Sequence, residues 1–165
     1  NELNGKCETL TFKSNYTKIK MIENPVLWLK EVQLTGDEID LYCLNNQLDS
    51  IYIAQNPFIV APEDSIGCYH QITGNNLEGK FIDNQIDYIK IKGNGIMKYF
   101  YNTNKLIGIN NVNAGNIKLV FNENNLKDVI CRRDIESNYI EVIKEELDTS
   151  KRDIMYLNGF KLRKK

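Results

Sequence analysis

Residues 36–53 read GDEIDLYCLNNQLDSIYI, and the pattern returns as GNNLEGKFIDNQIDYIKI in residues 74–91 and as AGNIKLVFNENNLKDVIC in residues 114–131. In each copy, apolar residues alternate with other residues up to a turn-forming cluster, such as Asn45-Asn46-Gln47, and a second apolar run follows. Alternation with a period of two is typical of a β-strand that is buried on one face. Each copy therefore predicts a β-hairpin.

A shorter copy begins at Gly5 and has its turn at Ser14-Asn15. A single two-stranded hairpin is only marginally stable in water, so repeated hairpins must cover their apolar faces with one another. We therefore expect an all-β fold of stacked hairpins that fold over into two walls.

The same offsets in each copy predict which side chains face inward. These wall positions are Leu10, Phe12, Ile39, Leu41, Ile51, Ile53, Leu77, Phe81, Ile89, Ile91, Ile117, Leu119, Phe121 and Val129. Two interpretations remain open at this point: an ordinary sandwich core, or an elongated apolar groove that accepts acyl chains. Gly79 stands at a wall position without a side chain and leaves room for the groove.

The offsets also restrict the hairpin loops. Pairing Leu41 with Ile51 leaves the three residues 45–47 in the loop, and such a loop usually needs one residue in the left-handed conformation. Leu48 would then point to the opposite face unless a β-bulge follows it. The sequence leaves these two alternatives open.

Further extended segments lie between the hairpins. Each opens at an asparagine, in Asn24-Pro25, Asn56-Pro57 and Asn94-Gly95, so we expect the chain to turn a corner at the same place in every copy. Residues 96–101 and 106–112 are expected to form another hairpin.

Composition excludes several functional classes. The chain has 21 Lys and Arg and 22 Asp and Glu, so its net charge is close to zero. A nearly neutral chain does not indicate binding to nucleic acid, which usually requires an excess of basic residues. No apolar run approaches the ~20 residues that span a bilayer, and the N-terminus shows no signal segment.

Few residues suggest catalysis or metal binding. The four cysteines lack metal-ligand spacing, and the sole histidine, His70, has no obvious nucleophile partner. Cys43 and Cys131 occupy positions that are apolar in the other copies, which indicates small core residues. Acidic residues such as Asp40 fall on the solvent side of the repeat. We therefore expect no enzyme, no metal and no cofactor.

The pattern changes near the C-terminus. We divide the chain into a β-domain, residues 1–133, and a tail, residues 134–165, that packs on or beside it. Residues 139–147 fit a helix and a strand equally well. A short helix is expected over residues 151–157, and Thr149 or Ser150 would cap it.

Three segments resemble a known family: Asn24-Pro25-Val26-Leu27-Trp28, Gln33-Leu34-Thr35-Gly36-Asp37-Glu38-Ile39 and Leu157-Asn158-Gly159-Phe160-Lys161. Together with the glycine-anchored hairpins they resemble the OstA-like proteins of Bacteroidetes-type bacteria, which are similar to the LptA/OstA lipopolysaccharide-transport family. The resemblance covers most of residues 20–162. It implies a twisted, taco-like β-jellyroll that shelters lipid acyl chains and joins its neighbours through its end strands. It also suggests the C-terminal part of a longer protein.

The resemblance implies a periplasmic lipid-binding and transport protein of the lipopolysaccharide-export type. The expected partners are lipopolysaccharide or lipid A, together with other transport proteins or further copies through the edge strands. The alternative is a structural or adhesive β-repeat module that acts by strand-edge pairing.

Overall fold

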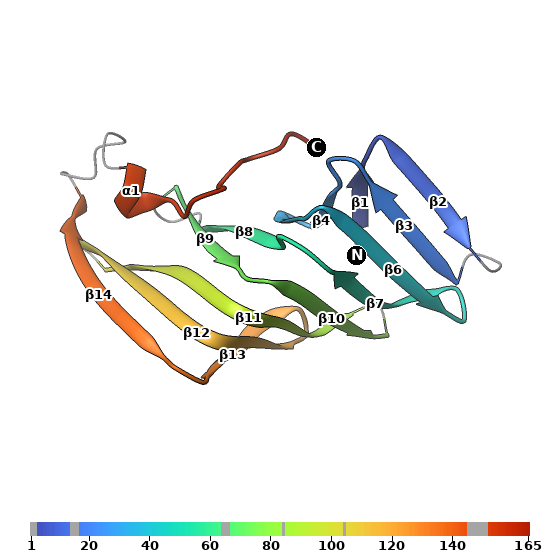
Figure 1. The fold of residues 1–165 in the computed structure, drawn as a ribbon. Coiled ribbons are helices and arrows are strands. Elements are labelled where there is room, and N and C mark those ends of the chain that lie inside the picture. The colour runs from blue at the N-terminus through green and yellow to red at the C-terminus, as the bar shows by residue number, and fades with distance from the viewer. Residues whose placement is uncertain (1–2, 14–16, 64–66, 84, 104, 145–151) are drawn as a thin grey trace.

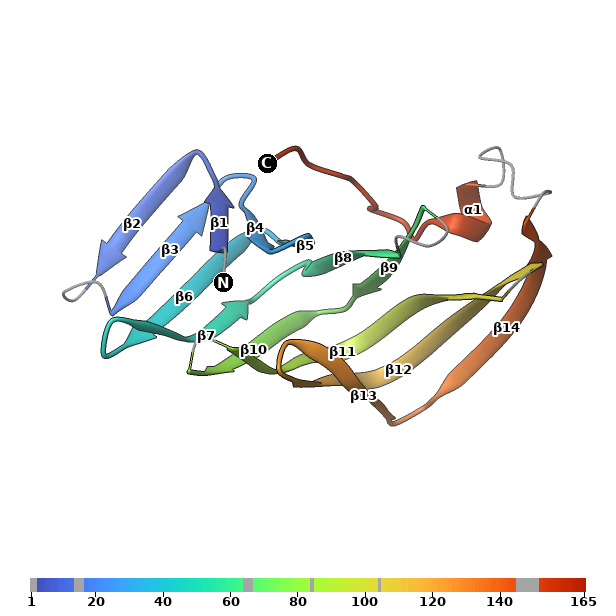
Figure 2. The ribbon, with the colours of Figure 1, turned by 180° about the vertical axis from the view of Figure 1, so that it is seen from behind.

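The computed structural model describes residues 3–13, 17–63, 67–83, 85–103, 105–144 and 152–165. In this part of the chain a 14-stranded antiparallel sheet carries one short helix (Figures 1 and 2). The elements are β1 (Leu3–Lys6), β2 (Thr9–Lys13), β3 (Lys18–Ile22), β4 (Val26–Leu29), β5 (Val32–Thr35), β6 (Glu38–Leu44), β7 (Gln47–Ile53), β8 (Phe58–Glu63), β9 (Cys68–Thr73), β10 (Asn76–Ile82), β11 (Gln85–Asn102), β12 (Leu106–Asn122), β13 (Asn125–Arg132), β14 (Glu136–Ile143) and α1 (Arg152–Met155).

The sheet curls into two walls that share the long strands β11 and β12. Wall A runs β2-β3-β6-β7-β10 and continues through the first half of β11 and the second half of β12 to β13. Wall B runs β1-β4-β5-β8-β9 and continues through the other halves of the long strands to β14. Figure 1 shows the resulting open, curled shape. The predicted all-β fold of stacked hairpins is confirmed, but the repeated hairpins do not divide between two walls: all of them lie in wall A, and wall B is built from the segments between them.

The chain passes between the walls at a line of corners. Asn24, Asn56, Asn94 and Asp134 all have positive φ, of 56°, 51°, 48° and 45°. Asparagine and aspartate tolerate this left-handed conformation better than other side chains do. The predicted corners therefore lie where the asparagines indicated.

Close packing at the same corners explains the glycine anchors of the repeat. A Cβ atom at Gly36 would collide with Cγ2 of Ile53, and one at Gly74 would collide with Cγ2 of Ile91. Glycine is therefore required because a neighbouring isoleucine occupies the space of its missing side chain.

The hairpins keep the predicted pairing but have a shorter loop than predicted. Leu41 pairs with Ile51, while Leu44 pairs with Gln47, so only Asn45 and Asn46 remain in the loop. Both have positive φ, of 51° and 62°, as a two-residue turn that matches the strand twist requires. The three-residue loop was wrong because a register shift between Tyr42 and Cys43 absorbs the additional residue.

This bulge decides the orientation of the residue after the loop. Cys43 pairs with Leu48, Phe81 with Ile86, and Phe121 with Leu126. Cross-strand partners share a face, so Leu48 and its equivalents point inward.

The tail contributes one more strand and a short helix. Strand β14 pairs with β12 and settles residues 139–143 as extended. The predicted helix to Leu157 was too long: α1 ends at Met155, and the N–H of Leu157 donates to Oε1 of Gln71 at 2.7 Å. The division of the chain at residue 133 stays a prediction, although β14 extends the sheet beyond it. Ser14-Asn15, Thr149 and Ser150 lie outside the described residues.

Candidate functional site

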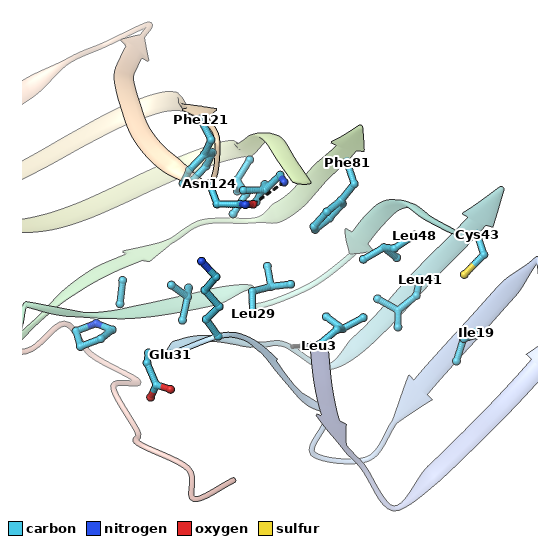
Figure 3. Close-up of a pocket in the computed structure, with 16 residues that line it drawn as sticks. Leu3, Ile19, Leu29, Glu31, Leu41, Cys43, Leu48, Phe81, Phe121 and Asn124 are labelled. Atoms are coloured by element: carbon cyan, nitrogen blue, oxygen red, sulfur yellow. Dashed lines mark hydrogen bonds between the residues drawn. The ribbon is translucent and has the colours of Figure 1, made fainter. Parts of the chain in front are cut away.

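An open cavity of about 720 Å³ lies between the two walls. Wall A contributes residues near its hairpin turns, and wall B contributes the ends of β1, β4, β5 and β8 (Figure 3). The lining residues are Leu3, Ile19, Leu29, Lys30, Glu31, Val32, Leu41, Cys43, Leu48, Ala61, Pro62, Phe81, Ile86, Ile89, Phe121 and Asn124.

The lining is almost entirely apolar. Lys30 and Glu31 carry the charges, and both belong to the turn between β4 and β5. Oδ1 of Asn124 accepts the N–H of Ile86 at 3.2 Å, so this amide oxygen already has a partner. Such a cavity suits an apolar chain and offers little for polar chemistry.

The shape of the cavity follows from the rows of the repeat. Ile39, Leu77 and Ile117 stand next to the corners and are fully buried. The rows farther from the corners, such as Cys43 with Leu48, line the cavity instead. The space between the walls is therefore a wedge that is filled with side chains at the corners and open toward the hairpin turns.

The predicted wall residues divide into three groups. Leu41, Phe81, Ile89 and Phe121 line the cavity. The residues in the closed core are Ile39, Ile51, Ile53, Leu77, Ile91, Ile117 and Leu119. Those on the end strands are Leu10, Phe12 and Val129, which are 48%, 52% and 38% exposed. The part that each of them plays in ligand binding stays a prediction.

Sequence reasoning missed much of the lining. The sequence did not decide whether Leu48 and Ile86 point inward or outward, because the bulge has no clear sequence signal. The lining residues of wall B were not among the predicted wall positions: Leu3, Leu29, Lys30, Glu31, Val32, Ala61 and Pro62. The continuous apolar run Val26–Leu29 was the signal that could have identified one of these strands as part of a wall, because such a run is consistent with a strand buried on both faces.

Gly79 lies beneath the cavity. A small void around it shares Leu29, Phe81, Ile86 and Ile89 with the main cavity. A Cβ atom at Gly79 would have its nearest neighbours at 3.8 Å, an ordinary van der Waals separation. This glycine thus leaves space in the wall, as its position in the repeat suggested.

The apolar inner face of wall A continues to both end strands. Phe12 pairs with Ile19, a cavity residue, and Leu10 pairs with the buried Met21. At the other end Val129 pairs with Leu119. The inner face is therefore exposed at both ends of the curled sheet.

His70 belongs to the structure of wall B. Its ring stacks on Tyr99 with centroids 4.1 Å apart, and its Nδ1 accepts the N–H of Phe100 at 3.2 Å. Nε2 lies 3.3 Å from a carboxylate oxygen of Glu63. Burial lowers the pKa of His70 despite this carboxylate. The geometry fits a neutral packing histidine.

Neither a disulfide nor a metal-binding cluster is found among the cysteines and acidic residues that the structure describes. No disulfide joins the four cysteines, all of which are described. Among the described residues, no three His, Cys, Asp or Glu side chains gather where they could hold a metal ion. In the same part of the chain, no helix has the length and apolar character needed to cross a membrane.

The sequence matches no protein-family model, and no curated protein matches it by sequence. The structure is similar to that of LptH from Pseudomonas aeruginosa, the LptA homologous periplasmic component of its lipopolysaccharide transport device. The TM-score is 0.61, the identity is 9%, and the match covers 86% of this chain and 94% of LptH. At this identity the likeness concerns the fold. It confirms an all-β chain whose antiparallel strands form a curled half-barrel like the LptA jellyroll.

Proposed function

We propose that the protein is a periplasmic lipid-binding and transport protein of the lipopolysaccharide-export type, which shelters acyl chains between its walls without catalysis. One observation carries the proposal: a fold like that of LptH keeps an open cavity of about 720 Å³ with an almost wholly apolar lining. A cavity of this size lies within the range of small-molecule sites.

Burial of acyl chains supplies the affinity. Each buried methylene contributes about 0.8 kcal/mol, so ten of them contribute about 8 kcal/mol before costs. Association itself costs about 4 kcal/mol or more, which leaves a single chain weakly bound. A second chain on the same molecule does not incur that cost again. A lipid with several acyl chains, such as lipid A, would therefore bind more tightly than a single chain.

The charged turn gives the lipid an orientation. Lys30 and Glu31 lie together on the β4–β5 turn, whereas the lining contributed by wall A is apolar except for Asn124. A polar headgroup would therefore lie near this turn, with the acyl chains toward Leu48 and Phe81.

The end strands supply the proposed protein partners. Leu10 and Phe12 are exposed on β2, and Val129 is exposed on β13. Unpaired strand edges with apolar side chains invite pairing with another sheet. Other transport proteins or further copies of this chain would extend the inner face there.

Strand-edge pairing also supports a second candidate, a structural or adhesive β-module. Tyr139 and Ile143 on β14 are 52% and 46% exposed, so this edge also offers apolar contacts. In that case the protein would self-associate without binding lipid. Sedimentation at several concentrations, together with lipid extraction, distinguishes the two candidates.

The cavity is tested by filling it. Ala61→Phe places a ring in the cavity, whereas Ala54→Phe makes the same change at an exposed position outside it. Delipidated protein is titrated with lipopolysaccharide and with cis-parinaric acid, which fluoresces when buried. We expect saturable binding that Ala61→Phe weakens at least tenfold and that Ala54→Phe leaves unchanged. Equal binding by the two variants would contradict the proposal.

A further inference from the structure

The outer face of wall B is covered by the end of the chain, residues 154–165, which we call the strap. Trp28 and Val60 point to this outer face, opposite Leu27 and Ile59 of the core, yet they are 4% and 1% exposed. Figure 1 shows the strap running from α1 past β9 and β8 toward β4. The strap shields an apolar surface that would otherwise face water.

Gln33 on β5 holds the far end of the strap. Its Nε2 donates to the carbonyl oxygen of Lys161 at 2.8 Å, and its Oε1 accepts the N–H of Arg163 at 2.8 Å. The side chain is buried, so both halves of its amide need a partner. The backbone of the strap supplies both.

Gln71 on β9 makes the equivalent pair at the near end of the strap. Its Nε2 donates to the carbonyl oxygen of Met155 at 2.8 Å, and its Oε1 accepts the N–H of Leu157 at 2.7 Å. Nζ of Lys98 donates to the carbonyl oxygen of Ile154 at 2.7 Å. The two glutamines therefore make matched contacts at opposite ends of the strap.

The last residue of the strap reaches the rim of the cavity. Nζ of Lys165 lies 2.7 Å from Oε1 of Glu31, and Glu31 lines the cavity together with Lys30 and Val32. Figure 3 shows Glu31 beside the C-terminal segment, in the turn that follows Leu29. Strap and cavity thus meet at the β4–β5 turn.

The hydrogen bonds between β5 and β8 do not reach the tip of this turn. The ladder between β5 and β8 extends from the pair of Thr35 and Phe58 to the pair of Gln33 and Val60. Glu31, and with it the tip of the turn, lies beyond that last pair. Among the described residues, the side-chain hydrogen bonds of the tip and its base go to the strap, through Glu31 and Gln33.

We infer that the strap positions the β4–β5 turn as one lip of the cavity and that Gln33 is the positioning residue. The inference rests on the proposed lipid-binding function. Gln33 lies on the face of wall B opposite the cavity, so it acts through Val32 and the turn rather than by touching the ligand. Loss of its contacts should let the lip open and release a bound lipid sooner.

The protein carries its own reporter for the strap. Trp28 is the single tryptophan, and it pairs with Gln33 across the β4–β5 ladder. It is buried on the face that the strap covers. Release of the far end of the strap should expose Trp28 and shift its fluorescence to longer wavelength, independently of any ligand in the cavity.

The test compares Gln33→Met with Gln71→Met in the full chain, because each removes two backbone contacts from one end of the strap. Dissociation of cis-parinaric acid is followed by stopped flow after mixing with excess unlabelled fatty acid. We expect Gln33→Met to speed dissociation about tenfold, as the loss of two ordinary hydrogen bonds would, and to shift the Trp28 emission. Gln71→Met should do neither.

A milder variant keeps the inference testable if Gln33→Met does not fold. Lys165→Gln removes only the exposed ion pair with Glu31 and should speed dissociation by about two- to threefold. Unchanged dissociation in a folded Gln33→Met variant, or in Lys165→Gln when Gln33→Met does not fold, would overturn the inference. Equal effects of Gln33→Met and Gln71→Met would also overturn it. Absence of probe binding by the parent protein would instead refute the proposed function.

Discussion

Alanine substitutions along one strand test whether the space between the walls is a wedge. Leu77 and Phe81 lie on β10 and point inward, but Leu77 is fully buried beside the corner whereas Phe81 lines the open cavity. Leu77→Ala removes a closed-core side chain and should lower the free energy of unfolding by about 3–4 kcal/mol.

Phe81→Ala removes more atoms than Leu77→Ala, yet it should lower the free energy of unfolding by less. Phe81 is 6% exposed, so the transfer of its side chain from water contributes about 2 kcal/mol. Little is added for a new cavity, because the space beside the ring is already open. We therefore expect a loss of about 2 kcal/mol instead of the 3–5 kcal/mol typical of a closed core.

Urea denaturation at equilibrium measures both losses, and titration with lipopolysaccharide measures binding by the folded variants. Phe81→Ala should weaken binding severalfold, while a folded Leu77→Ala protein should bind as the parent does. A larger loss of stability for Phe81→Ala than for Leu77→Ala, with unchanged lipid affinity, would refute the wedge.

Three further substitutions test individual positions. Gly79→Ala should raise the free energy of unfolding by about 0.5–1 kcal/mol in urea denaturation, because the new methyl enters a void without a clash; a loss of stability would contradict the packing described. Gly36→Ala should lower the free energy of unfolding by about 1–3 kcal/mol, because the new Cβ atom would overlap Ile53. An unchanged melting temperature would show that the corner can relax. Burial lowers the pKa of His70, so the unfolded chain binds a proton at this residue at a higher pH than the folded chain does. The free energy of unfolding should therefore fall as the pH drops from about 7 to about 5. His70→Gln should flatten that pH profile, and an identical slope in the variant would exclude His70 as its source.

The hairpins of wall A were predictable because a period of two sets both the buried face and the register. Leu41 and Ile51 pair as the alternation required. The loop length was not predictable, because a bulge after Leu48 changes it by one residue while preserving the inward face. That one residue decides whether Leu48 belongs to the cavity.

Wall B was harder to predict because the strap buries its outer face. Val26, Leu27 and Trp28 are all buried, so β4 reads as a continuous apolar run instead of an alternating one. The cause lies more than a hundred residues away, where Arg163 bonds to Gln33. A contact at that separation leaves no local pattern, so the sequence predicted a tail that packs on or beside the β-domain but not its path over wall B or its contact with the lip of the cavity.

Photocrosslinking tests the central claim, that acyl chains occupy the space between the walls, most directly. A fatty acid with a diazirine at its chain end is bound to the full chain, irradiated, and located by peptide mass spectrometry. The chain end should label the hairpin-side residues of the cavity, above all Leu48, Ile86 and Phe121, and an excess of lipopolysaccharide should suppress this labelling. Labelling confined to the exposed edge strand β14, unaffected by lipopolysaccharide, would contradict the account.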